Sequence, residues 1–152
     1  MTKDATEKRE GERSQLNDML CFTVYSTAHA FNRVYKPLLD ALKLTYPQYL
    51  VMLGLWERDG VTVKQIGELI HLDSGTLTPL LKRLEAAGLV RRARDAADER
   101  QVRISLTPKG AALRERARTV GHGVVDACQQ SRDELKALNA QLVKLRDKLN
   151  AS

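Results

Sequence analysis

Apolar side chains recur at helical spacing along most of the chain. From residue 14 they return near multiples of 3.6 residues, which predicts one long helix that is kinked or stopped at Pro37. A second helix is expected to open at Tyr46-Pro47, because proline fits the first helical turn, and to end near residue 59. Its expected buried residues are Leu50, Leu53 and Trp56.

The middle of the chain has the clearest pattern, that of two short helices joined by a tight turn. Thr62 and Gln65 have the spacing of a capping box, which predicts the start of the first helix. Asp73 or Ser74 is expected to cap the second, with Pro79 close to its N-terminal turn. The apolar positions expected to be buried are Ile66, Leu69, Ile70, Leu77, Leu80, Leu81 and Leu84. This pair predicts a helix-turn-helix.

After this pair the apolar period changes from helical to alternating. Residues 102–106 predict a strand with one buried face, and residues 89–92 can pair with it. A hairpin directly after a helix-turn-helix is a wing. Helices are then expected from Thr107-Pro108 and from Ser131, the last with leucines at alternating steps of three and four residues.

The predicted fold is therefore mainly α with a small β-hairpin wing. It is a winged helix-turn-helix at residues 47–107, with helices at 14–46 and 108–152 that form a helical dimerisation domain. The last helix is too short for an independent coiled coil, but it can pack on the first helix of a second subunit. Residues 1–13 are charged and nearly free of apolar side chains, so we expect a flexible tail.

Charge narrows the class of partner. The formal net charge of +6 and the isoelectric point near 9.5 favour a polyanion. Residues 82–109 alone hold eight Lys or Arg against four Asp or Glu, either as a solvated face or as a surface for nucleic acid. Their place on the second helix and the hairpin favours DNA. The helix candidates are Ser74, Thr76, Thr78, Lys82 and Arg83, and the hairpin candidates are Arg94, Arg100 and Arg103, with Asp98 holding the Arg100 region in shape.

Other classes of protein are disfavoured. The longest apolar run is too short to span a bilayer, so a cytoplasmic protein is expected, with its two cysteines reduced. The three histidines have no metal-ligand spacing with each other or with the cysteines. We therefore expect no metal, no cofactor and no enzymatic activity.

The hairpin also carries a resemblance. The run Asp98-Glu99-Arg100-Gln101-Val102-Arg103-Ile104-Ser105-Leu106-Thr107 closely resembles the wing signature of MarR-family winged-helix repressors, although Ala96-Ala97 stands where an acidic-Pro step is common. The resemblance extends from about residue 14 to the C-terminus. It implies a homodimer that binds a pseudo-palindromic double-stranded operator, with Arg100 entering the minor groove.

Cys21 lies on the first predicted helix, and three tyrosines are candidates for contact with its thiol. Tyr25 is one turn away and can shield the thiol, whereas Tyr35 is fourteen residues away, about 21 Å along the axis. Tyr46 lies beyond Pro37, so Tyr35 and Tyr46 are expected to reach the cysteine of a partner subunit. Phenolic hydroxyls stabilise a thiolate, the species that attacks peroxides. The apolar neighbours Phe22 and Phe31 favour an organic peroxide, and the alternative is a cysteine that only packs in the core.

The cysteine and tyrosine spacing resembles that of the OhrR-type organic hydroperoxide sensors within the MarR family, as does the run Leu-Asp-Ser-Gly-Thr-Leu-Thr-Pro at 72–79. The two-cysteine type implies that Cys128 resolves oxidised Cys21 as an intersubunit disulfide, which releases the operator. Two alternatives stay open: a MarR-type repressor that responds to a small phenolic ligand, and a thiol peroxidase, against which the lack of a CxxC pair argues.

Overall fold

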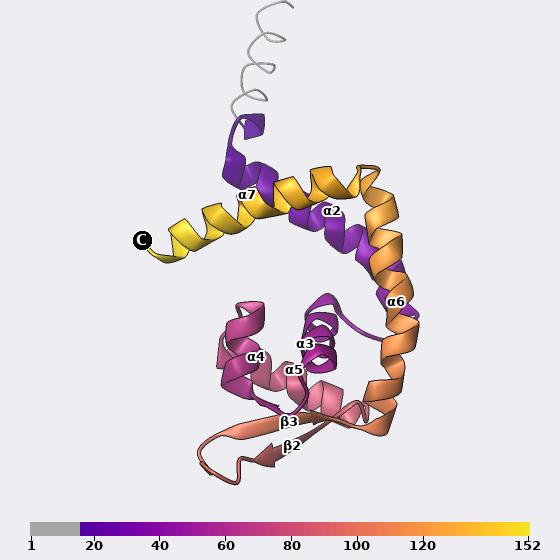
Figure 1. The fold of residues 1–152 in the computed structure, drawn as a ribbon, viewed down its shortest axis with the longest axis vertical. Coiled ribbons are helices and arrows are strands. Elements are labelled where there is room, and N and C mark those ends of the chain that lie inside the picture. The colour runs from indigo at the N-terminus through magenta and orange to yellow at the C-terminus, as the bar shows by residue number, and fades with distance from the viewer. Residues whose placement is uncertain (1–15) are drawn as a thin grey trace, which may run out of the picture.

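The structure, a computed structural model, describes residues 16–152, so the tail expected at residues 1–13 lies outside the described residues. It confirms a mainly helical chain with a small antiparallel sheet (Figure 1). Its elements are α2 (Leu20–Asp40), α3 (Tyr46–Glu57), β1 (Val61–Thr62), α4 (Val63–Ile70), α5 (Ser74–Ala86), β2 (Val90–Arg94), β3 (Val102–Leu106), α6 (Pro108–Cys128) and α7 (Arg132–Asn150).

The helices form two groups. Figure 1 shows α3, α4 and α5 gathered on the sheet, while α2, α6 and α7 arch around this compact unit. A single core joins α3, α4, α5, the sheet and the inner face of α6. We call the part from α3 to β3 the winged unit. Among residues 16–152, no helix is long and apolar enough to cross a membrane.

The sequence predicted that the first helix is either kinked or stopped at Pro37, and the structure shows that α2 does not stop there. It continues to Asp40, three residues beyond the proline. Proline removes one backbone donor, here the one for the carbonyl of Arg33, and so close to the helix end this loss affects only the last turn. The expected helix is also interrupted near its start, because the extended backbone of Met19 separates the helical residues 16–17 from α2, which begins at Leu20.

The capping predictions for the helix-turn-helix are confirmed. Thr62 and Gln65 form a complete capping box at α4, and the cap of α5 is Asp73 rather than Ser74. His71 adopts a left-handed conformation (φ 56°) that makes the turn between the two helices tight. Pro79 lies in the second turn of α5 and the helix continues through it.

Two burial predictions are wrong. Leu53 is 37 % exposed and Leu69 is 55 % exposed, whereas Trp56, Ile66 and the four leucines of α5 are buried as expected. Leu50 and Ile70, also expected to be buried, are half-buried. Helix α3 is apolar on nearly all sides, so periodicity cannot tell its outer face from its inner one. Leu69 lies over Gly54, whose missing side chain leaves room for only part of the leucine.

The sheet contains one strand more than the sequence predicted. Its order is β1-β3-β2, all antiparallel, with Val90 opposite Leu106 in the expected hairpin and Val61 opposite Ile104 in the additional pair. Strand β1 has only two residues, too few for an alternating pattern. It nevertheless places the start of α4 beside the hairpin.

The first turn of α6 is tied to the winged unit by three contacts. Thr107 caps the helix and donates its hydroxyl to the carbonyl of Gly88 at 2.6 Å. The indole Nε1 of Trp56 donates to the carbonyl of Gly110 at 2.9 Å. Gly110 itself lies so close to the main chain that an added Cβ would be 2.0 Å from the carbonyl oxygen of Leu89. We call this arrangement the α6 junction.

Apolar side chains remain uncovered on two helices. No residue of α7 is buried, and three of its leucines are exposed, Leu138, Leu142 and Leu149, the last with 67 % of its surface. On the N-terminal half of α2, Leu20 and Val24 are also exposed. Both helices therefore present apolar faces that nothing within residues 16–152 covers.

Of the three glycines of α6, Gly110 is the one with the least room for a side chain. We expect Gly110→Ala to lower the free energy of unfolding by about 3 kcal/mol, because the methyl group must displace the Leu89 main chain. Urea unfolding followed by circular dichroism measures this.

The matched control is Gly121→Ala in the same helix, where an added Cβ meets no atom within 4 Å. Removing a helical glycine there leaves stability unchanged or raises it by up to about 1 kcal/mol. Equal unfolding midpoints for the two variants would contradict the close contact at Gly110.

Candidate nucleic-acid interface and redox site

The polar residues expected to contact DNA lie outside the buried leucine stripe of α5. Ser74, Thr76, Lys82 and Arg83 are exposed and Thr78 is half-buried. Asp73 accepts a hydrogen bond from the backbone N–H of Thr76 at 2.8 Å and so fixes the start of the helix. That bond is the main reason why the pKa of Asp73 lies below its usual value.

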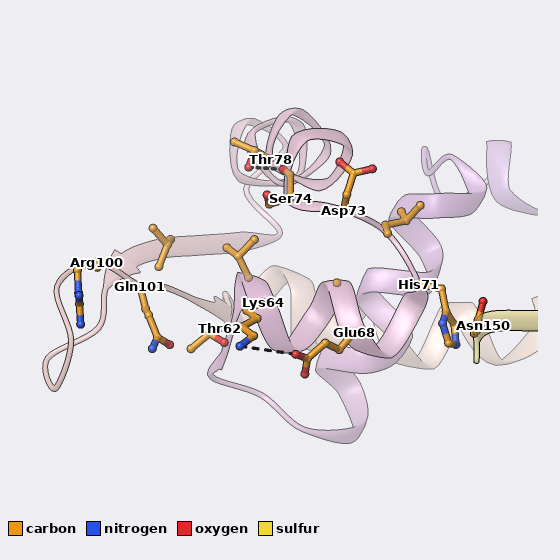
Figure 2. Close-up of a pocket in the computed structure, with 14 residues that line it drawn as sticks. Thr62, Lys64, Glu68, His71, Asp73, Ser74, Thr78, Arg100, Gln101 and Asn150 are labelled. Atoms are coloured by element: carbon orange, nitrogen blue, oxygen red, sulfur yellow. Dashed lines mark hydrogen bonds and ion pairs between the residues drawn. The ribbon is translucent and has the colours of Figure 1, made fainter. Parts of the chain in front are cut away.

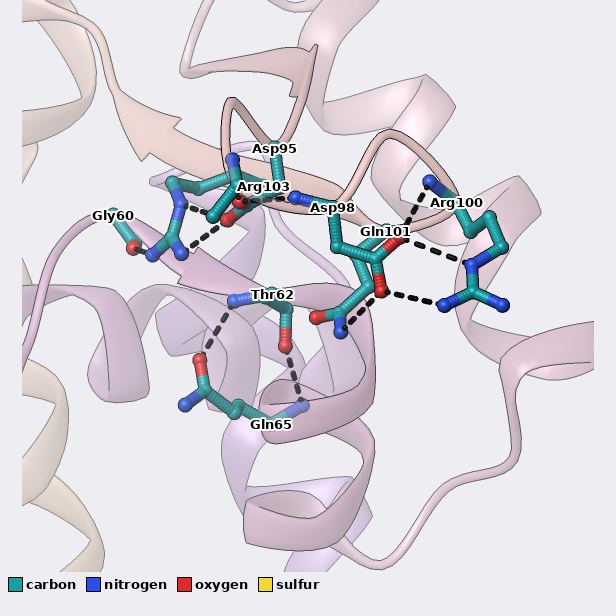
Figure 3. Close-up of polar contacts among 9 residues, drawn as sticks. Gly60, Thr62, Gln65, Asp95, Asp98, Arg100, Gln101 and Arg103 are labelled. Atoms are coloured by element: carbon teal, nitrogen blue, oxygen red, sulfur yellow. Dashed lines mark hydrogen bonds and ion pairs between the residues drawn. The ribbon is translucent and has the colours of Figure 1, made fainter.

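The wing is shaped from within by Asp95, a residue that the sequence analysis missed. Its carboxylate is only 6 % exposed and accepts backbone hydrogen bonds from Ala97 at 2.8 Å and Asp98 at 3.2 Å (Figure 3). The Arg103 guanidinium donates to the same carboxylate through Nε at 2.8 Å and through a second nitrogen. These bonds, the one from Ala97 foremost, lower the pKa of Asp95.

Arg103 is thus placed differently from the phosphate contact expected for it. One nitrogen of its guanidinium donates to the carbonyl of Gly60, which precedes β1, and two others donate to Asp95. We call Asp95, Arg103 and Gly60 the wing clamp. The hairpin register could have revealed it, because Arg103 pairs with Ala93 only two residues before Asp95.

Arg100 has the opposite environment at the tip of the wing. Its side chain is 91 % exposed, while Asp98 accepts from its backbone N–H and its Nε, both at 3.1 Å. The Arg100 side chain is the main cause of the lowered pKa of Asp98. Arg94 donates to the carbonyl of Glu99 at 3.3 Å from the other side of the loop. The exposed guanidinium of Arg100 is therefore presented by a loop with defined geometry.

A second contact that sequence reasoning missed joins the wing to α5. The Nε of Arg92 donates to the carboxylate of Glu85 at 2.8 Å, and the backbone N–H of Arg92 donates to it at 3.1 Å. The two residues are seven apart across a helix end and a turn, a separation with no periodic signal. The contact fixes the angle between α5 and the hairpin.

A groove of about 800 Å³ lies between α5 and the wing. Figure 2 shows Thr78 and Ser74 at the top, Arg100 and Gln101 at the left, and Lys64 and Glu68 of α4 below them. Its labelled residues include the cations Lys64 and Arg100 and the acids Glu68 and Asp73, with Lys64 and Glu68 4.0 Å apart. The groove thus joins both sets of predicted DNA contacts. Within residues 16–152, no cluster of His, Cys, Asp and Glu could hold a metal ion.

Tyr35 and Tyr46 meet at the C-terminal half of α2. Their ring centroids are 4.7 Å apart, and the ring of Tyr49 is 6.0 Å from that of Tyr35. Burial raises the pKa of Tyr35 to about 12, with further contributions from Tyr46, Tyr49 and Cys128. These phenols therefore stay protonated and can donate hydrogen bonds. Tyr49 was missed, although it follows Tyr46 by one helical turn.

The environment of Cys21 is open in a single chain. Cys21 is exposed, Phe22 is half-buried and Phe31 is exposed. The ring of Tyr25 packs edge-on against His29 with a centroid distance of 4.4 Å, so this tyrosine is directed toward the next turn. Tyr25 was expected to shield Cys21 within one chain, whereas the thiol of this chain is exposed.

Cys128 is the last residue of α6 and is half-buried against α2. It lines an apolar pocket of about 200 Å³ with Phe31, Val34 and Val124, among others. The pocket residues on α2 run from position 27 to 34, six to thirteen positions after Cys21, which is about 9–20 Å along the helix. A disulfide needs its Cα atoms within about 7 Å, so the two cysteines of one chain are not placed to bond.

Comparison with known proteins agrees with this geometry. A family model described as transcriptional regulator SarA/Rot matches residues 33–116. The HTH-type transcriptional regulator TtmR of Methylorubrum extorquens is 55 % identical over 90 % of this chain and 70 % of its own length. The organic hydroperoxide resistance transcriptional regulator of Bacillus subtilis is 46 % identical over 91 % of this chain and 95 % of its own.

The fold has solved counterparts too. Reduced AbfR bound to DNA superposes with a TM-score of 0.78 and 35 % identity, covering 93 % of this chain and 97 % of that one. The disulfide form of AbfR, a protein of Staphylococcus epidermidis, superposes with a TM-score of 0.61 and 34 % identity over 95 % and 97 % of the two chains. With its winged unit, wing signature and these relatives, the chain belongs to the MarR family of winged-helix transcriptional regulators, of the SarA/Rot type.

Proposed function

We propose that this regulator is a homodimeric repressor that releases operator DNA when an organic hydroperoxide oxidises Cys21. The observation that carries the proposal is the separation of the thiol from its tyrosines. Tyr35 and Tyr46 touch each other at one end of α2, and Cys21 lies near the other end, about 21 Å from Tyr35 along the axis. A thiolate pocket thus needs the α2 helices of two chains.

The uncovered apolar faces support such a dimer. The N-terminal half of α2 and the whole of α7 expose leucine and valine side chains. Burying them against the same helices of a second copy removes both faces from water, which is the driving force of obligate interfaces. Antiparallel α2 helices then bring Cys21 of one chain toward the phenols of the other.

The phenols suit thiolate chemistry. A protonated Tyr35, with its pKa raised to about 12, can donate a hydrogen bond to a sulfur anion and stabilise its negative charge. The thiolate attacks the terminal oxygen of the hydroperoxide, the O–O bond breaks, and the alkoxide leaves as an alcohol after taking up a proton. Cys21 becomes a sulfenic acid.

Cys128 is the proposed resolving thiol. Its sulfur attacks the sulfenic sulfur of the other subunit's Cys21, the S–O bond breaks, and water leaves as the disulfide forms. Cys128 already borders α2 in the apolar pocket next to Tyr35, the tyrosine proposed to face the partner's thiol. The disulfide form reported for AbfR supports a redox mechanism of this kind.

Helix α6 provides the link to DNA. It runs without interruption from the α6 junction to Cys128, 21 residues or about 30 Å. A pull on Cys128 therefore reaches the winged unit through one rigid element. We infer that the two α5 helices then lose the separation of one DNA turn that a pseudo-palindromic operator requires.

In the DNA-bound state, α5 lies in the major groove and Arg100 at the wing tip enters the minor groove. Lys82 and Arg83 supply phosphate or guanine contacts, and Arg94 supplies a phosphate contact beside the wing. The similarity to reduced AbfR, whose structure is bound to DNA, supports DNA as the partner.

The redox proposal is tested with cumene hydroperoxide and non-reducing gels. The native protein is expected to form a covalent dimer, and both Cys21→Ser and Cys128→Ser are expected to stay monomeric on the gel. A native protein that shows only the monomer band would sink the disulfide step. Release from DNA that persists in Cys21→Ser would favour the regulator that binds a phenolic ligand.

The tyrosine donors are tested by the rate of sulfenic acid formation. We expect Tyr35→Phe and Tyr46→Phe to slow it about tenfold at neutral pH, because one charge-assisted hydrogen bond to the thiolate, worth about 1.5–3 kcal/mol, is lost. Trapping with dimedone under single-turnover conditions measures the rate. Equal rates for both variants and the native protein would count against a shared pocket.

The contact of Arg100 with DNA is tested by fluorescence anisotropy on a duplex selected by the native protein. Arg100→Ala should weaken binding about tenfold and lower the slope of log K against log salt by about one, since one cation leaves the interface. Arg118→Ala is the control, because that exposed arginine of α6 pairs only with its neighbour Glu115. Identical losses in the two variants would contradict a specific role for Arg100.

The wing clamp gives a test in which charge and geometry predict opposite signs. Asp95→Asn raises the net charge by one, so charge alone predicts tighter binding to DNA. We expect weaker binding by about threefold to tenfold instead, because the amide cannot accept all the bonds that shape the wing. The pKa of Asp95 is lowered in the folded protein, so its ionised carboxylate stabilises the fold at pH values above the ordinary pKa of aspartate. This stabilisation is lost as the pH falls through the pKa of Asp95 in the folded protein.

A further inference from the structure

Two threonines of α5 have already used their hydroxyl protons. Thr78 Oγ1 donates to the carbonyl of Ser74 at 2.7 Å, and a carbonyl can only accept (Figure 2). Thr76 Oγ1 is 3.0 Å from Oδ2 of Asp73. The pKa of Asp73 is lowered, chiefly by the Thr76 backbone N–H, so its carboxylate is ionised at neutral pH and also only accepts. Both protons are therefore directed into the helix.

What remains on each hydroxyl is a pair of acceptor sites. A threonine hydroxyl has one proton and two lone pairs, so a hydroxyl whose proton is engaged offers only acceptors to a partner. Thr76 is exposed, and Thr78 lines the groove between α5 and the wing. Pro79 adds to this character, because it lacks the N–H that the carbonyl of Gly75 bonds in a regular helix. The outer face of α5 near its start is thus rich in acceptors.

This polarity excludes some DNA contacts and selects others. Phosphate oxygens are acceptors, so these two hydroxyls are poor phosphate ligands. In the major groove, guanine O6 and N7 and thymine O4 are acceptors, whereas cytosine N4 and adenine N6 are the amino donors. We propose that Thr76 and Thr78 are specificity-determining residues that favour cytosine or adenine at the bases they face. The proposal rests on the placement of α5 in the major groove.

Asp73 then sets the polarity of Thr76 without touching a base. Asn caps a helix as well as Asp does, so the oxygen of Asp73→Asn keeps the bond from the Thr76 backbone N–H. The atom beside Thr76 Oγ1 becomes an NH₂ group, which donates to that oxygen. The hydroxyl proton turns outward, and Thr76 changes from an acceptor into a donor. Preference at its base should move from cytosine or adenine to guanine or thymine.

The experiment selects from a pool of duplexes with a randomised centre and sequences the bound fraction. The native protein is expected to enrich cytosine or adenine at two positions in each half-site, and Asp73→Asn is expected to change the base at one of them. Thr76→Val and Thr78→Val, which keep the side-chain shape, should each lose about fivefold in preference at one position. The charge that Asp73→Asn removes raises affinity for all sequences alike and does not alter the ranking of bases.

Thr119→Val is the matched control, because that hydroxyl makes the same type of bond, to the carbonyl of Arg116, but lies on α6. It should leave the selected sequence unchanged. A second measurement uses only native protein and the enriched duplex. Replacing the contacted adenine by purine, or the cytosine by 2-pyrimidinone, removes the amino group and should cost about fivefold in affinity.

The outcomes separate the two proposals. If the native protein enriches a motif and the Thr76→Val, Thr78→Val and Asp73→Asn variants all enrich the same motif, the assignment of these threonines is overturned. The proposal that the protein is a repressor is not affected by that result. A native protein that enriches no sequence from the pool overturns both. A loss of preference in the Val variants together with insensitivity to the amino-free bases also overturns the assignment.

Discussion

The α6 junction connects the winged unit rigidly to α6, a helix about 30 Å long. The Trp56 indole donates to the Gly110 carbonyl, Thr107 donates to Gly88, and the bare Cα of Gly110 rests on the main chain of Leu89. These contacts join the first turn of α6 to α3 through Trp56 and to the turn between α5 and β2 through Gly88 and Leu89. With this turn fixed, any displacement of the far end of α6 must move the winged unit, α5 included, or bend α6 itself.

The conformation of the wing depends on the buried carboxylate of Asp95, as the close packing at the α6 junction depends on Gly110. Asp95 gathers two backbone donors and the guanidinium of Arg103, and through Arg103 it holds the carbonyl of Gly60. The exposed Arg100 is therefore carried by a loop that is ordered before DNA arrives. Ordering in advance lowers the entropy lost on binding, since less of the loop has to be immobilised in the complex.

The sequence was sufficient for features that are local in the chain. Capping boxes at Thr62 and Ser131, the leucine stripe of α5 and the alternating strand at 102–106 were all predicted, because each depends on neighbours within four residues. Strand β1, the wing clamp and the Glu85–Arg92 pair were not, since they join segments far apart or too short for a period. The prediction that Leu53 and Leu69 are buried was wrong for a related reason, because the presence of an apolar side chain does not indicate which neighbour, if any, will cover it.

The raised pKa of Tyr35 has a consequence for the hydrogen-bond donors of the proposed thiolate pocket. Because its pKa is raised to about 12, the Tyr35 hydroxyl stays protonated throughout the physiological pH range and remains a hydrogen-bond donor in the proposed pocket. The hydrogen-bonding character of this part of the proposed pocket therefore does not change with pH over that range, and the ring contact between Tyr35 and Tyr46 needs no rearrangement to accommodate a charge.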